Sequence, residues 1–151
     1  MALCFLVSSV VVSSLAACDN NNYVGESAIQ QAGSGVRVVL CQHIRATTVR
    51  LTEPSDGQSF EDTTNTFFLA TGKTSIHRGQ AFTTNTGIRQ LRTVDSVAPL
   101  LKEGQFVVLH VNNDELRSFY KIPKTGLPTL KWLRSDGKTT IAPCSGAFLG
   151  G

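Results

Sequence analysis

The chain has 151 residues, of which 41% are hydrophobic and 17% are charged. This length indicates one domain, and this composition excludes a long disordered chain or a collagen-like repeat. The net charge of +3 is unevenly distributed: residues 1–18 carry no charged side chain, residues 19–62 carry a net −3 and residues 63–151 a net +6. No apolar run reaches the roughly 18 residues that span a bilayer.

The N-terminus has the pattern of an export signal. Residues 5–17 form a short apolar stretch that ends in small residues, as secretory signal peptides do. The run Leu15-Ala16-Ala17-Cys18 resembles the lipobox of bacterial lipoproteins. That resemblance implies cleavage before Cys18, acylation of Cys18 and attachment to a lipid bilayer through two or three acyl chains. An ordinary signal peptide cut after Ala17, or an uncleaved hydrophobic helix, remains the alternative.

The residues after Cys18 bear on localisation. In the lipoprotein family, an Asp in the position of Asp19 implies retention at the inner membrane, on the periplasmic side of the cell envelope. We expect residues 1–17 to be the signal peptide and residues 18–34 to be the lipidated cysteine and a polar tether, with a short helix over 25–32 as the competing interpretation. Residues 35–151 would then form the folded domain.

The cysteine count predicts one disulfide. With Cys4 in the signal and Cys18 acylated, Cys41 and Cys144 remain. An even remainder in an oxidising compartment favours a bond between them, although two unpaired buried thiols are the alternative.

The folded part has a β-type composition, rich in Val and Thr. The sequence predicts a mainly β fold, a small antiparallel sandwich or barrel-like domain. Its expected strands are 36–41, 47–52, 66–70, 80–84, 88–92, 106–111, 129–134 and 138–141, the last two joined by a hairpin through Ser135-Asp136-Gly137. Apolar spacing suggests a helix over 93–102, and residues 114–120 fit either a helix or a return strand.

Residues 106–147 resemble, in part, the C-terminal half of a thioredoxin fold. The resemblance rests on a strand over 106–111, an acidic helix start at Asp114, the run Leu127-Pro128-Thr129-Leu130, and a hairpin before Gly146. It implies an α/β thioredoxin-like alternative in which Pro128 faces the redox site. The redox CxxC is replaced by residues 91–94, Leu-Arg-Thr-Val, so this alternative describes a degenerate binding or redox-partner domain.

No motif indicates a catalytic residue, a metal or a cofactor. Gly72-Lys73-Thr74 lacks the glycine that a phosphate-binding loop needs five residues earlier and is expected to be a polar loop. The acidic group Asp56, Glu61 and Asp62 fits a solvated turn better than a Ca²⁺ loop. The three histidines are scattered, and His110 lies on an apolar strand where a buried, hydrogen-bonded role is expected. A hydrolase whose triad assembles only in space remains open.

A basic and aromatic stretch provides the interface candidates, which are Arg117, Phe119, Tyr120, Lys121, Lys124, Lys131, Trp132, Arg134 and Lys138. An aromatic anchor ringed by cations is a common interface composition, although Trp132 also fits a core position. We therefore expect a non-enzymatic envelope lipoprotein, a structural or accessory subunit that contacts a protein or a cell-wall polymer. The small positive charge of an exported domain does not suggest nucleic-acid binding.

Overall fold

The computed structural model describes residues 26–53, 65–99 and 101–144. These residues form ten strands and no helix, and so contain no helix suited to crossing a membrane. The strands are β1 (Ser27–Ala32), β2 (Gly35–Leu40), β3 (Ile44–Thr52), β4 (Thr66–Ile76), β5 (Ala81–Thr83), β6 (Leu91–Ser96), β7 (Phe106–Val111), β8 (Leu116–Lys121), β9 (Trp132–Arg134) and β10 (Thr139–Thr140). The signal segment, Cys18 and the acidic group at 56–62 lie outside the described residues.

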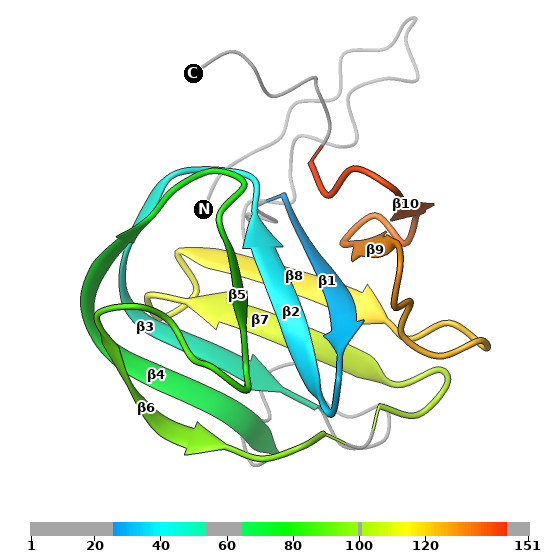
Figure 1. Cartoon of the computed structure of the whole chain (residues 1–151), viewed down its shortest axis with the longest axis horizontal. Coiled ribbons are helices and arrows are strands. Elements are labelled where there is room, and N and C mark those ends of the chain that lie inside the picture. The colour runs from blue at the N-terminus through cyan, green and yellow to red at the C-terminus, as the bar shows by residue number, and fades with distance from the viewer. Residues whose placement is uncertain (1–25, 54–64, 100, 145–151) are drawn as a thin grey trace, which may run out of the picture.

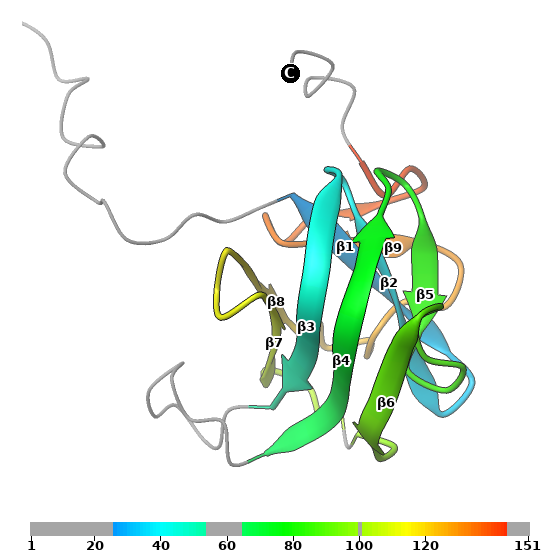
Figure 2. The same cartoon turned by 90° about the vertical axis from the view of Figure 1, so that its left-hand side faces the viewer.

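Two antiparallel sheets of five strands make up the fold. One has the order β10-β9-β1-β2-β5, which we call sheet A, and the other has the order β6-β4-β3-β7-β8, which we call sheet B. Figure 1 looks through sheet A on to β7 and β8 of sheet B, and Figure 2 looks on to β3, β4 and β6 of sheet B. The prediction of a mainly β antiparallel sandwich is confirmed. The thioredoxin-like alternative for the fold is wrong, because the described residues contain no helix.

The folded domain begins earlier in the chain than the predicted residue 35. Ser27–Ala32, assigned to the tether or to a short helix, pair with β2 from Ser27↔Leu40 to Ala32↔Gly35. The polar composition of this segment concealed a strand, because its polar side chains have partners inside the fold. Ser27 is fully buried, and its hydroxyl hydrogen-bonds Ser118 and the phenol of Tyr120 on β8.

In sheet B, the helix expected over 93–102 was also wrong. Residues 91–96 form the edge strand β6, and a register shift between Asp95 and Thr93 leaves Val94 as a bulge, exposed to solvent. Leu116–Lys121 form a return strand, the alternative that the sequence left open. The turn before it holds Asn112, Asn113 and Asp114 at positive φ, a conformation that Asn and Asp tolerate better than most residues.

The main core lies between the sheets. Inward-facing aliphatic and aromatic side chains from both sheets form one cluster, and the rings of Phe68 on β4 and Phe82 on β5 stack across it with centroids 6.3 Å apart. A second, smaller cluster covers the outer side of sheet A and consists of Ala28, Val39, Cys41 and Trp132, with Ala81 and Cys144 packed against it.

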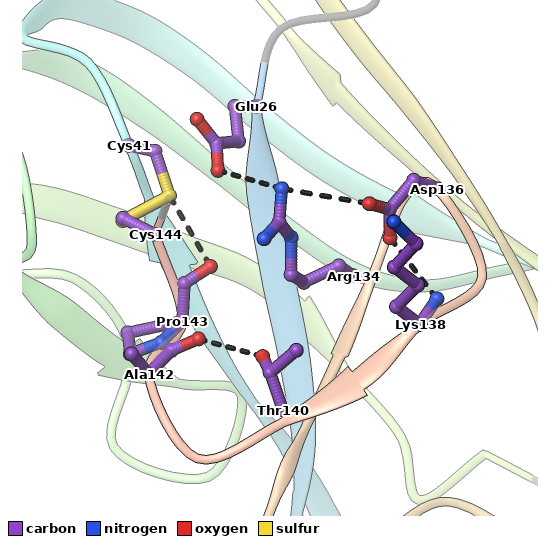
Figure 3. A network of polar contacts seen from close by, with 9 residues as sticks. All are labelled: Glu26, Cys41, Arg134, Asp136, Lys138, Thr140, Ala142, Pro143 and Cys144. Atoms are coloured by element: carbon purple, nitrogen blue, oxygen red, sulfur yellow. Dashed lines mark hydrogen bonds and ion pairs between the residues drawn. A yellow bond between two sulfur atoms is a disulfide. The ribbon is translucent and has the colours of Figure 1, made fainter. Parts of the chain in front are cut away.

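The predicted disulfide joins Cys41 to Cys144 across 103 residues (Figure 3). Beside it, Arg134 bridges two carboxylates, Glu26 at 3.0 Å and Asp136 at 3.5 Å, so the start of β1 is tied to the β9–β10 hairpin. The backbone N–H of Cys41 donates to the carbonyl of Glu26 at 2.9 Å. These contacts close the C-terminal segment against the beginning of the domain.

Candidate functional site

The predicted interface does not form one aromatic surface. Trp132 is 8% exposed and Tyr120 is 1% exposed, so neither ring can anchor a partner from the surface. The guanidinium of Arg37 lies 5.5 Å from the Trp132 ring centroid, and Arg134 is engaged with Glu26 and Asp136. The physical reason is strand alternation, which turns Tyr120 into the main core and Trp132 on to the disulfide.

The other candidates of that stretch lie on two different sheets. Arg117 and Phe119 are half-buried on β8, with the guanidinium 5.1 Å from the ring centroid. Lys121, Lys124, Lys131 and Lys138 are exposed. Lys121 ends a strand of sheet B, whereas Lys131 and Lys138 belong to the region of the β9–β10 hairpin in sheet A. The stretch therefore supplies separate exposed cations and not an exposed aromatic side chain surrounded by cations.

A hollow opens instead on the β3–β4 ladder. Its volume is about 390 Å³, and its lining comes from three chain segments: Arg45, Ala46 and Thr47; Lys73, Thr74 and Ser75; and Gln90. We call it the β3–β4 hollow. Its lining combines two cations with hydroxyl and amide groups, a set that can bind an anion and hydrogen-bond to its neighbours.

A β-bulge shapes this hollow. Arg45 pairs with Ser75 and Ala46 with Thr74, but the register then shifts so that Thr47 has no partner on β4. On the opposite edge of β3, where β7 pairs, the side chain of Asn112 binds the same backbone segment. Its Oδ1 accepts from the Thr47 backbone N–H at 2.7 Å, and its Nδ2 donates to the carbonyl of Arg45 at 2.5 Å. The turn between β7 and β8 therefore fixes the backbone under the hollow.

The far wall is held by Gln90. This residue has φ of 69°, in the left-handed region, and its Oε1 accepts from the hydroxyl of Thr74 at 3.0 Å. Arg45 and Lys73 are both exposed, and neither forms an ion pair with a carboxylate in the part of the chain that the structure describes. The hollow thus presents two cations whose charges are not balanced by the surrounding described residues.

Lys73 and Thr74 come from the string that resembled a fragment of a phosphate-binding loop. The expectation of a polar loop there was wrong, since both residues lie inside β4. Sequence reasoning missed the hollow because its lining is spread over three segments, and because a β-bulge leaves no clear sequence signal. The only available signal was the cluster of Thr, Ser, Lys and Arg on adjacent strands.

A buried polar chain crosses the outer side of sheet B. The hydroxyl of Thr52 lies 3.3 Å from Nε2 of His110, and Nδ1 of His110 lies 2.5 Å from Asp114 Oδ1. The order hydroxyl, imidazole, carboxylate is that of a nucleophilic triad. However, Thr52 is fully buried and His110 is 4% exposed, so a substrate cannot reach the hydroxyl. These hydrogen bonds tie the β7–β8 turn to β7 and β3. The prediction that His110 is buried and hydrogen-bonded is therefore confirmed.

Burial governs the pKa shifts of this region. It lowers the pKa of His110, with the Asp114 carboxylate opposing the shift and Arg50 and Arg117 adding to it. Burial also raises the pKa of the Glu53 carboxyl, partly offset by Lys102, and raises that of the Tyr120 phenol. His110 is therefore favoured in its neutral form, consistent with Nδ1–H donating to Asp114 and Nε2 accepting from Thr52.

The description of the histidines as scattered was wrong for two of them. His43 and His77, 34 residues apart, face each other with their Nδ1 atoms 3.2 Å apart. Sequence reasoning missed the pair because only the β3–β4 register brings the two positions together.

Comparison of the chain with protein-family models, with curated proteins and with solved structures gave no match. The site is therefore interpreted from its own geometry.

Proposed function

We propose that the protein is a non-enzymatic, membrane-anchored lipoprotein of the bacterial cell envelope, whose β-sandwich acts as an accessory module that binds an anionic cell-wall polymer at the β3–β4 hollow. The anchor in this proposal is acylated Cys18, and Asp19 assigns it to the inner membrane, facing the periplasm. The disulfide between Cys41 and Cys144 supports an oxidising compartment, because such bonds are rare in reducing cytosol.

The observation that carries the binding proposal is the pair of cations in the hollow, neither of which has a carboxylate partner among the described residues. Arg45 and Lys73 line the hollow together with the hydroxyl-bearing residues Thr47, Thr74 and Ser75 and the amide of Gln90. A carboxylate or phosphate would receive charge-assisted hydrogen bonds from the cations, while neighbouring sugar hydroxyls would meet Thr47, Ser75 and Gln90.

The charge of the whole domain favours the same kind of partner. Residues 26–151 carry fourteen Lys and Arg residues against ten Asp and Glu residues, a net charge of +4. Such a field attracts anionic polymers and weakens with ionic strength, because exposed charges are screened within about 10 Å at 0.1 M salt.

Co-sedimentation with purified peptidoglycan sacculi, which carry carboxylates on a glycan network, tests the binding. The full chain should sediment with sacculi at low salt, and Arg45→Gln combined with Lys73→Gln should weaken binding at least about tenfold, the loss of two charge-assisted contacts. The matched control is Lys124→Gln combined with Lys138→Gln, which removes the same charge elsewhere. Equal weakening by both pairs, or no binding by the wild type, would contradict the proposal.

The anchor has its own test. Intact mass spectrometry of protein purified from native membranes should give a chain that begins at Cys18 and carries acyl groups, with two hydrogens gained on reduction. Cys18→Ser should release the protein from the membrane fraction. An unacylated wild-type chain in that fraction would overturn the lipoprotein assignment while leaving the binding proposal intact.

One observation favours a protein partner as a second candidate. Leu130 is 89% exposed and Ile141 is 82% exposed, on either side of the β9–β10 hairpin and beside Lys131 and Lys138. Exposed aliphatic groups next to cations suit a protein contact better than a glycan. Chemical cross-linking in intact envelopes, compared between wild type and Leu130→Ser, should then lose one specific adduct. An unchanged cross-linking pattern would remove this candidate.

A further inference from the structure

The imidazoles of His43 and His77 form an exposed pair next to the β3–β4 hollow. Their Nδ1 atoms are 3.2 Å apart, and their ring centroids are 4.8 Å apart with the planes tilted by 50°. Both side chains lie at the surface, whereas the adjacent residues Ile44 and Ile76 are buried and paired with each other. The pair thus continues the outer face of the β3–β4 ladder by one step beyond Arg45 and Ser75.

Both histidines belong to turns that the fold holds in place. His43 follows the disulfide-bonded Cys41 by two residues. His77 opens the turn into β5, in which its backbone N–H donates to Gln80 Oε1 at 3.1 Å and its carbonyl accepts from the Gln80 N–H at 2.9 Å. The two turns are joined by a bond from the Gly79 N–H to the Leu40 carbonyl at 2.9 Å. Figure 2 shows the start of β3 and the end of β4 meeting at the same end of sheet B.

The separation of the two nitrogens suits a shared metal ion. A divalent transition metal binds imidazole nitrogen at about 2.0–2.1 Å, so two nitrogens 3.2 Å apart subtend an angle of about 100° at the metal. This value lies between the roughly 109° of a tetrahedral site and the roughly 90° of a square-planar one. We propose that His43 and His77 form a two-histidine binding site for a divalent transition-metal ion of the Cu²⁺ or Zn²⁺ class.

The remaining coordination positions would be open. Among residues 26–53, 65–99 and 101–144, no group of three or more His, Cys, Asp or Glu side chains surrounds a common point. Water, or an anionic group of a ligand, therefore completes the coordination. His43 and His77 each lie two residues along the chain from the paired residues Arg45 and Ser75, which line the hollow. Imidazole suits Cu²⁺, Ni²⁺ and Zn²⁺, and affinity for such sites is highest for Cu²⁺.

Metal binding requires a change of tautomer. Without metal, one Nδ1–H donates to the Nδ1 lone pair of the other ring. A shared ion needs both Nδ1 lone pairs, so the proton on the donating Nδ1 passes through solvent to Nε2 of the same ring. The rings stay neutral and no net proton is released. This change gives the site a spectroscopic signature independent of any mutation.

Cu²⁺ titration of the full chain, purified without a polyhistidine tag, tests the site. Isothermal titration calorimetry should give one Cu²⁺ per chain, and electron paramagnetic resonance should show two nitrogen ligands. His43→Asn or His77→Asn should weaken binding at least about tenfold, since even losing an outer-shell partner of a ligand commonly costs 10–100-fold. Lys124→Gln, which removes an exposed cation outside the hollow and changes no imidazole, should retain the site. Unchanged Cu²⁺ affinity in the double variant H43N/H77N would overturn the proposal.

A measurement on the unmutated protein removes dependence on variant folding. In long-range ¹H–¹⁵N spectra, Zn²⁺ should convert both rings to the tautomer with hydrogen on Nε2, and Mg²⁺ should have no effect. Persistence of the Nδ1–H···Nδ1 hydrogen bond in excess Zn²⁺ would contradict the site. Because the readout is the imidazole pair, sacculus binding can fail while metal binding persists, and the reverse also holds.

Discussion

Two regions of the molecule use cationic side chains in different ways. On the outer side of sheet A, Arg134 has carboxylates from Glu26 and Asp136, and Arg37 lies over the ring of Trp132. On the outer face of the β3–β4 ladder, Arg45 and Lys73 have no such carboxylate among the described residues, and the rings of His43 and His77 contact each other.

The difference separates side chains that hold the fold from side chains available to a ligand. A cation already bound to two carboxylates contributes to folding and has little remaining attraction for a partner. A pair of cations kept apart from carboxylates contributes little to folding and retains its attraction for an anion.

The largest effect is expected from the disulfide. Removing it by reduction, or by Cys41→Ser together with Cys144→Ser, releases a loop of about 100 residues and should cost about 2–5 kcal/mol of the free energy of unfolding. Urea unfolding with and without reductant measures the loss. A urea midpoint that is unchanged by reduction would show that the fold is stable without the disulfide, and would contradict this prediction.

A smaller loss is expected from Arg134→Ala, which leaves the Glu26 carboxylate, 9% exposed, without this cation. The cost should be about 1–2 kcal/mol, the typical loss when a hydrogen bond between charged, partly buried groups is removed. Lys138→Ala, an exposed cation of the same hairpin, is the control and should stay within about 0.5 kcal/mol. Equal effects of the two substitutions would contradict the structural role of Arg134.

A pH effect should trace to His110. Burial lowers its pKa in the folded state below the ordinary 6.5, so the unfolded chain binds more protons than the folded chain between the two values. This contribution to stability is present above pH 6.5 and is lost as the pH falls through the interval below it. His110→Gln should therefore flatten the fall in the urea midpoint over that interval. A wild-type midpoint that rises on acidification relative to His110→Gln would reverse the assigned direction.

The smallest effect on stability is expected in the hollow. Arg45→Gln and Lys73→Gln should each change the free energy of unfolding by no more than about 0.5 kcal/mol, because both side chains are exposed and have no carboxylate partner in the described structure. Thermal unfolding measures this, alongside the loss of sacculus binding. A loss of unfolding free energy as large as that of Arg134→Ala would show that Arg45 or Lys73 stabilises the fold, and would contradict this prediction.

The sequence predicted the parts of the fold that depend on local signals. A Val-rich run marked β2, alternating apolar and polar side chains marked β3, the apolar run marked β7, and Ser135-Asp136-Gly137 marked the β9–β10 turn. Cysteine arithmetic predicted the disulfide. β1 was missed because Gln30 and Ser27 read as a tether, although the fold buries both and supplies partners for them.

The candidate sites depend on register, which the sequence does not display. The hollow needs a bulge at Thr47 and the side chain of Asn112, 65 residues away, to stabilise it. The histidine pair needs Ile44 opposite Ile76. In the predicted interface, residue types were read correctly as basic and aromatic, but alternation placed Trp132 and Tyr120 inside, which composition alone cannot indicate.

The most direct test of the binding proposal is to map a soluble cell-wall fragment on the protein by nuclear magnetic resonance. A carboxylate-bearing muropeptide titrated into ¹⁵N-labelled full chain in detergent micelles should shift the amides of Thr47, Thr74, Ser75 and Gln90 more than any others. The shifts should shrink when salt is added, because they depend on Arg45 and Lys73. Shifts centred on the β9–β10 hairpin, or no shifts at all, would contradict the assignment of the β3–β4 hollow as the binding site.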